Sequence, residues 1–279
     1  DPDPFRMRIA EIAATDVRLD PPAAATEGGL PADEAAWRTL RLSAITLTGD
    51  GEITVEEVRL RASGLDDETL REGTLAVSGV AIPMATIEDE DMRANLDALG
   101  YDGIAFDLAV DGTWAPANGV LDLEDVRVTA RDMGVLTFTA TLGGLTEEVL
   151  EKLQAEEQNP DEQLAMLNNV TVTSLTLAWA DAGLASRVLG MMADTQGTSV
   201  DALAGQLAQA LPAMLSAIGN EAFEAEVADA AGSFLQEPGT LTVTARPQNP
   251  VPIAQIVGAA MMSPGAIPTV LGVSVSASE

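Results

Sequence analysis

A repeated strand motif is the feature that most constrains how this chain of 279 residues can fold. The segment GEITVEEVRLRA at 51–62 matches GVLDLEDVRVTA at 119–130 position for position, with five identical residues. A weaker third copy, VTVTSLTLAW at 170–179, keeps the same spacing of apolar residues. Because an internal repeat is typical of architectures that stack one unit, the chain is predicted to reuse one strand motif along a sheet.

Each copy contains a shift in its alternation of apolar and polar residues. Two alternating apolar residues are followed by two polar residues and then by two more alternating apolar residues. Since strand side chains alternate between two faces, the second apolar pair would reach the opposite face unless the strand bulges or bends. The pattern therefore predicts bulges or corners at Glu56–Glu57, Glu124–Asp125 and Thr173–Ser174. Bulges let a sheet curl strongly, which predicts a gutter or a half-barrel.

Four other segments alternate without a shift, and each is predicted to be a strand with one buried face: residues 104–110, 136–142, 241–245 and 271–277. With residues 40–48 and 75–82, about ten strands are predicted. Helical patterns occupy 88–99, 146–157, 161–167, 183–194, 199–218, 220–235 and 252–262. Thr146 and Ser199 precede acid-rich first turns, which are typical of helix N-termini. The predicted fold class is α+β, with a strongly curved, largely antiparallel sheet covered by a C-terminal helical cluster.

The chain divides by charge into two regions that we expect to form one continuous domain. Residues 1–169 are an acidic, repeat-containing β-rich region, and residues 170–279 add a strand and the helical cluster to the same sheet. No charged residue lies between Arg246 and Glu279. Four prolines interrupt that stretch, and a membrane-spanning helix needs about 20 consecutive apolar residues. We therefore predict no transmembrane segment.

The composition removes most catalytic chemistry. The chain has no histidine, no cysteine and one lysine, and its formal net charge is -30. General bases near neutral pH, activated nucleophiles and zinc ligands are most often histidine or cysteine. The chain is therefore predicted to be non-enzymatic, without a cofactor or a metal. The negative charge also excludes nucleic acid as a partner, because binding to phosphates depends on clustered lysine and arginine.

The first residues, DPDP, include neither an initiator methionine nor an apolar leader. This opening is typical of a mature exported protein whose signal peptide has been removed, and we expect a periplasmic location. The absence of cysteine is compatible with the periplasm, because a chain of this size does not depend on disulfides.

Acidic motifs leave one alternative open. GDGEITVEE at 49–57 resembles the second half of an EF-hand calcium loop, but Thr46 and Thr48 stand where the leading carboxylates belong. Two acidic runs, at 66–68 and 88–91, have the oxygen ligands that a hard cation prefers, although such runs are usually solvated. A calcium-stabilised acidic protein is therefore an alternative hypothesis.

Large apolar side chains are the candidate binding residues. Trp114, beside Pro116 and Asn118, is assigned to a hairpin turn. The other candidates sit in predicted strands and helices, where they either fill an ordinary core or line a pliable apolar pocket. The predicted lining residues are Phe106, Phe138, Leu177, Trp179, Met214 and Met261.

Two parts of the chain resemble known families. YDGIAFDLAVDG, followed by GVLDLEDVRVTARDMGVLTFTATLGGL, resembles the repeats of AsmA-like envelope proteins, and the resemblance covers about residues 37–145. The region 181–277, from DAGLASRVLG to LGVSVSA, is similar to the C-terminal part of uncharacterised exported alphaproteobacterial proteins. The first resemblance implies a curled sheet whose concave apolar face holds acyl chains and a role in moving lipid between membranes. This chain is shorter and more acidic than that family.

Two functional hypotheses follow. The first is an exported, non-enzymatic protein that binds a hydrophobic or lipid-like ligand in the bacterial envelope. The second is a structural or assembly factor that engages an envelope protein partner. An exposed, uncharged patch built from residues 250–275 would favour the second hypothesis.

Overall fold

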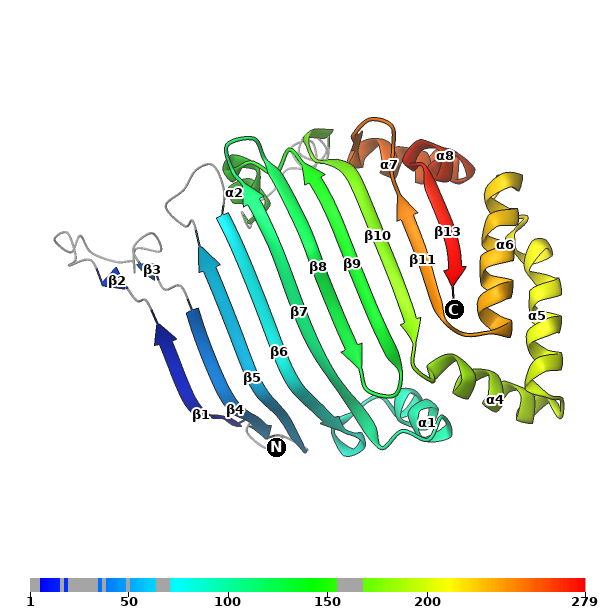
Figure 1. The fold of residues 1–279 in the computed structure, drawn as a ribbon, viewed down its shortest axis with the longest axis horizontal. Helices are drawn as coiled ribbons and strands as arrows, with labels where there is room; N and C mark the ends of the chain where they lie inside the picture. The colour runs from blue at the N-terminus through cyan, green and yellow to red at the C-terminus, as the bar shows by residue number, and fades with distance from the viewer. Residues whose placement is uncertain are drawn as a thin grey trace.

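The computed structural model describes residues 6–15, 18–19, 35–36, 39–48, 51–63, 71–154 and 168–278. One antiparallel sheet of 11 strands dominates it, in the order β1-β4-β5-β6-β7-β8-β9-β10-β11-β13, with β12 paired to β10. The sheet is curved and does not close on itself, so the chain is an α+β protein as predicted. Figure 1 shows the strands side by side in one layer.

The sheet strands are mostly long and follow the chain order. They are β1 (Arg6–Thr15), β4 (Thr39–Thr48), β5 (Glu52–Ser63), β6 (Arg71–Pro83), β7 (Gly103–Ala115), β8 (Val120–Ala130), β9 (Gly134–Gly143), β10 (Thr171–Asp181), β11 (Thr240–Ala245), β12 (Val251–Pro252) and β13 (Val273–Ser278). A separate pair consists of β2 (Arg18–Leu19) and β3 (Ala35–Ala36).

The described helices lie at the ends of the strands and beyond the C-terminal strands (Figure 1). They are α1 (Glu90–Ala98), α2 (Glu147–Gln154), α4 (Leu184–Gln196), α5 (Val200–Leu215), α6 (Glu221–Gln236), α7 (Ile253–Met262) and α8 (Ile267–Leu271), with 3-10 turns η1 (Met84–Thr86) and η2 (Pro264–Ala266). All but α8 and the two 3-10 turns were expected from the helical pattern. The helix predicted at 161–167 lies outside the described residues.

Local signals explain where several elements begin and end. Ser199 caps α5, because its hydroxyl oxygen accepts a hydrogen bond from the Ala202 N–H at 3.2 Å. Gly272 ends α8 in the left-handed conformation, so the last strand begins at Val273 rather than at Leu271 as predicted. Trp114 lies within β7, not in the following turn as its proline and asparagine neighbours suggested.

Two of the three predicted bulges are confirmed. The register between β8 and its neighbours shifts at Glu124–Asp125, between Asp111 and Gly112 on the β7 side. The register between β9 and β10 shifts between Val172 and Ser174. Each bulge adds one residue to a strand, and this addition restores the phase of the alternation.

The third shift takes a different form. At Glu56–Glu57 the pairing of β5 keeps its register with both β4 and β6, so the predicted bulge is not there. Both neighbours shift at the same level, and Ala44 of β4 and Gly79 of β6 adopt left-handed backbone conformations, with φ of 49° and 62°. Because β4, β5 and β6 shift at the same level, they stay in register with one another. The register shift appears instead between β6 and β7, where it falls between Val77 and Val80 of β6.

Two buried clusters form the core of the described residues, and neither lies under the middle of the sheet. Leu145, Val149 and Val170 form the first cluster, where α2 meets the ends of β8, β9 and β10. Leu189, Ala193 and Leu203 form the second cluster, within the helices α4 to α6. Helix α6 packs against β11 and β13, and α8 packs against β13. The helical cluster therefore covers the C-terminal strands of the sheet.

Candidate functional site

The cross-strand register places the apolar residues of the sheet on one face, because residues paired across strands share a face. One row of directly paired residues crosses nine strands: Leu40, Leu60, Leu75, Val110, Val126, Phe138, Leu177, Val243 and Val275. A second row comprises Ile12, Leu42, Val58, Val77, Leu108, Val128, Leu136, Trp179, Leu241 and Ala277. We call the surface that carries these rows the apolar face.

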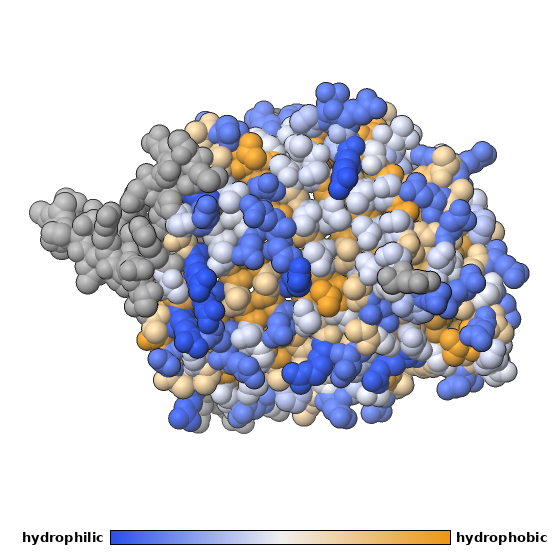
Figure 2. Space-filling model, in the orientation of Figure 1, coloured by the Kyte–Doolittle hydropathy of each residue, from blue (hydrophilic) through white to orange (hydrophobic). Residues whose placement is uncertain are grey.

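The opposite face has a different composition. The row that follows Arg41 across the sheet continues through Arg59, Ala76, Ala109, Arg127, Thr137, Ala178, Thr242 and Ser276. Figure 2 shows one face of the molecule, on which blue and white residues are spread over the strands and orange, hydrophobic residues are scattered among them. The bulges keep this separation intact, because each one returns the next apolar residue to the apolar face.

The apolar face is only partly covered. Most of its side chains are half-buried, Leu177 is 39% exposed and Ile12 is 65% exposed. Only a few of its residues, such as Ile45 and Val80 at 7% exposure, are fully buried. Ten strands at a spacing of about 4.8 Å make a surface roughly 45 Å wide. An apolar surface of that extent marks a site for a ligand, a partner or a membrane.

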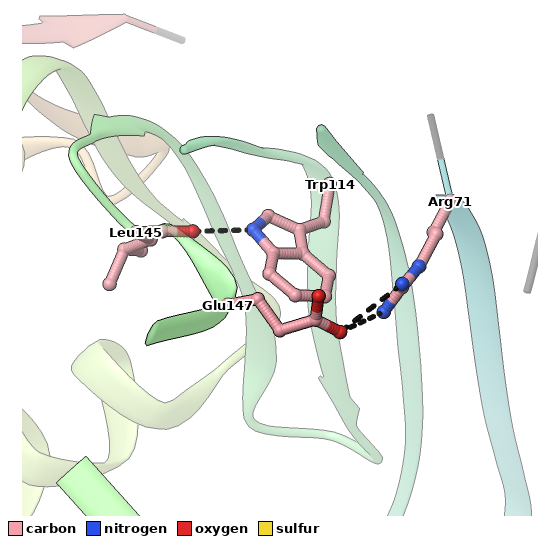
Figure 3. A network of polar contacts seen from close by, with 4 residues as sticks. All are labelled: Arg71, Trp114, Leu145 and Glu147. Atoms are coloured by element: carbon pink, nitrogen blue, oxygen red, sulfur yellow. Dashed lines mark hydrogen bonds and ion pairs between the residues drawn. The ribbon is translucent and has the colours of Figure 1, made fainter. Parts of the chain in front are cut away.

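Helix α2 closes one end of the apolar face through a polar network (Figure 3). Trp114 pairs with Leu121 across the sheet and so lies on the apolar face. Its indole Nε1–H donates a hydrogen bond to the Leu145 carbonyl oxygen at 2.7 Å. Arg71 stacks over the indole ring at 5.0 Å and donates to Glu147 Oε1 at 3.3 Å. These contacts fix the start of α2 against the sheet.

The structure brings together four of the six predicted lining residues. Phe138 and Leu177 are direct cross-strand partners, while Phe106 and Trp179 lie on the same face in neighbouring rows. Trp179 packs so closely on Gly134 that a Cβ there would lie 2.4 Å from the indole ring. The lining role of these residues stays a prediction.

The two methionines lie elsewhere. Met214 of α5 is 70% exposed and Met261 of α7 is 83% exposed, and neither belongs to the sheet. The prediction favoured large and adaptable side chains. It missed the aliphatic leucines and valines that make up most of the apolar face. The sequence feature that identifies these leucines and valines is the shifted alternation of apolar residues, compared across all the strands.

The acidic motifs of the sequence are not gathered into a cation site among the described residues. No three acidic side chains there converge as metal ligands. Glu57, from the EF-hand-like segment, pairs instead with Arg41 and, at 2.5 Å, with Arg59. Lys152 lowers the pKa of Glu148 through a hydrogen bond and its charge. The acidic run at 66–68 lies outside the described residues, and within them the calcium hypothesis has no assembled ligand set.

Fold and site together define a class: an α+β protein built on an open antiparallel sheet with one partly exposed apolar face. The chain belongs to a protein family described as "Uncharacterized protein", whose model matches residues 127–278. That match runs from within β8 to the end of β13. No curated protein matches the sequence. None of the described helices is long and apolar enough to cross a membrane.

Proposed function

We propose that this protein is a non-enzymatic, exported binder of lipid-like ligands in the bacterial envelope, which holds acyl chains against the apolar face. The observation that carries the proposal is the pair of apolar rows that crosses the sheet with no charged side chain in either row. The resemblance to AsmA-like envelope proteins supports the same function.

An acyl chain matches the chemistry of this surface. It has no hydrogen-bonding groups, and apart from the indole N–H of Trp179 the side chains of the two rows offer none, so contact sacrifices few hydrogen bonds to water. Each buried methylene group contributes about 0.8 kcal/mol. One acyl chain spans about 15 Å, half of a bilayer core of about 30 Å. The apolar face has room for several such chains side by side.

Two measurements test the proposal. Solvent extracts of the protein purified from an envelope fraction are analysed by mass spectrometry, and we expect bound phospholipid or fatty acid. The lipid-free protein is then titrated with a brominated fatty acid, which quenches tryptophan fluorescence on contact. We expect quenching that Trp179→Phe reduces and that Trp179→Phe combined with Trp114→Phe largely removes, because both indoles lie on the apolar face.

A matched pair of variants on β10 separates the two faces. Leu177 lies on the apolar face, whereas Thr176 pairs with Thr139 and Thr244 on the opposite face. Leu177→Glu is expected to reduce fatty-acid binding at least tenfold, and Thr176→Glu is expected to leave it unchanged. Equal binding by both folded variants, or no bound lipid in any preparation, would reject the proposed function.

One observation favours the second candidate function, docking of an envelope protein partner. Helix α7 carries no charge and exposes Val257, Met261 and Met262, at 42%, 83% and 89% exposure. Methionine-rich surfaces adapt to varied apolar partners. If α7 is the docking surface, Met261→Ser/Met262→Ser abolishes a stoichiometric complex recovered from the envelope and leaves lipid loading intact. Recovery of the complex with this variant would reject docking through α7.

A further inference from the structure

A cavity of about 450 Å³ lies at the opposite end of the apolar face from α2. It is bounded by the ends of β6 and β7, by the residues after α1, by the β8–β9 turn and by α4. Ile82 and Ile104 line the cavity, and they are direct cross-strand partners on the apolar face. Ala81 and Ala105, a cross-strand pair on the opposite face, line it as well, so the cavity lies at the end of these strands and borders the surface that we propose for acyl chains.

Arg187 is held at the cavity by neutral groups. Its Nη1 donates hydrogen bonds to the carbonyl oxygens of Leu99, at 2.9 Å, and Gly100, at 3.3 Å. Its guanidinium lies 4.5 Å from the centre of the Tyr101 ring. Tyr101 is only 8% exposed, and its hydroxyl donates to the Asp132 carbonyl oxygen at 2.9 Å. These contacts fix the guanidinium in place and leave its charge without a carboxylate partner.

Arg131 contributes a second guanidinium to the cavity. It lines the same cavity, and within the described residues neither Arg131 nor Arg187 forms an ion pair. Five other described arginines, Arg41, Arg59, Arg71, Arg93 and Arg127, pair with carboxylates, whereas the two arginines beside this cavity do not. A guanidinium binds phosphate oxygens through paired, charge-assisted hydrogen bonds.

The cavity also carries negative charge. Asp102 and Asp132 line it together with the two arginines, so both signs face the same space. The formal net charge of -30 disfavours a ligand that is itself net negative. A ligand with one phosphate and one ammonium group fits both conditions, because each group finds a counter-charge and the whole carries no net charge.

We propose that this cavity binds the headgroup of a zwitterionic phospholipid of the phosphoethanolamine class. The phosphate lies against Arg131 and Arg187, the ammonium group lies against Asp102 or Asp132, and the acyl chains leave the cavity over Ile82 and Ile104. This inference rests on the proposed function, because the same apolar face holds the chains. It adds a headgroup preference that acyl binding alone does not require.

The test compares four probes with the lipid-free protein by titration calorimetry. They are a short-chain phosphatidylethanolamine, the diacylglycerol and the phosphatidylglycerol with the same chains, and free phosphoethanolamine. We expect the phosphatidylethanolamine to bind about tenfold more tightly than either matched lipid. Free phosphoethanolamine is expected to bind far more weakly than the lipid.

Arg131→Gln is the decisive variant, because no hydrogen bond or ion pair of this side chain holds the described structure together. It should lower affinity for the phosphatidylethanolamine about tenfold and leave affinity for the diacylglycerol unchanged. Arg246→Gln is the matched control, since Arg246 is also exposed and unpaired in the described structure but lies outside the cavity. Melting curves confirm that both variants are folded.

Each contrary result has a distinct meaning. Equal affinity for the phosphatidylethanolamine and the diacylglycerol would overturn the headgroup site and leave acyl binding standing. Tight binding of the phosphatidylglycerol would overturn the zwitterion preference in favour of a simple anion site. If free phosphoethanolamine bound as tightly as the lipid, the site would serve a soluble ligand. Failure of all four probes would overturn the proposed function as well.

Discussion

The indole N–H of Trp114 donates to the carbonyl oxygen of Leu145, and this bond ties the end of β7 to the start of α2 (Figure 3). Trp114→Phe keeps an aromatic ring but leaves the carbonyl of the buried Leu145 without its partner. We expect a loss of about 1–2 kcal/mol in the free energy of unfolding, measured by urea denaturation. Glu147→Gln removes only the exposed ion pair with Arg71, and we expect a change below about 0.5 kcal/mol. The reverse order would show that the ion pair holds α2.

Gly79 provides a test of the shared shift in β4, β5 and β6. Its φ of 62° is left-handed, and an added Cβ would lie 2.3 Å from the Glu56 side chain. Gly79→Ala is therefore expected to cost about 1–2 kcal/mol in the free energy of unfolding. Gly73, also in β6, has open space at its Cβ position, so Gly73→Ala should be neutral or slightly stabilising. Equal melting temperatures for the two variants would show that the left-handed conformation is not required.

Glu57 separates two arginines that face each other across β4 and β5. Arg41 and Arg59 are direct cross-strand partners, and both pair with its carboxylate. Glu57→Gln leaves like charges opposite each other and should cost about 0.5–1 kcal/mol, less at high salt. Glu52→Gln, on the same strand, removes one negative charge from an acidic protein and should be neutral or stabilising. Destabilisation by both variants alike would contradict this role.

Tyr101 is the only tyrosine in the chain, so its ionisation is measured directly by ultraviolet absorbance. Burial raises its pKa above 10.0, although the charge of Arg187 lowers it in part. Because the folded state binds this proton more tightly, the contribution of Tyr101 to the free energy of unfolding is fully present below the pKa of the unfolded state. It is lost as the pH rises through the pKa of the folded state. Arg187→Gln should raise the pKa of Tyr101 further. A lower pKa in that variant would contradict the stacked geometry.

Sequence periodicity predicted most of the fold, because alternation and helical spacing are local properties. The shifts at Glu124–Asp125 and Thr173–Ser174 were placed correctly from six or seven neighbouring residues each. The strand β1 was missed, although Met7, Ile9 and Ile12 show the same shifted spacing. It lacks the leading glycine and the Val-Arg pair that the copies at 51–62 and 119–130 share.

The bulge expected at Glu56–Glu57 was misplaced for a physical reason. Whether a shifted strand bulges depends on its neighbours, and here both neighbours shift at the same level. The candidate cavity was also beyond prediction. Tyr101, Arg131 and Arg187 are separated by tens of residues, and only the packing of α1, the β8–β9 turn and α4 brings them together. No local pattern contains that information.

Glu226 of α6 has a consequence for assembly. Its carboxylate accepts a hydrogen bond from the backbone N–H of Val275 at 2.7 Å, on the last strand of the sheet. A side chain thus takes the place that a neighbouring backbone carbonyl would hold, and α6 covers the rest of that edge. Head-to-tail fibrils grow only when each copy offers a bondable strand at both ends. Glu226 and α6 therefore block this edge strand, so the sheet cannot extend from it by pairing with a second copy, despite its long apolar surface.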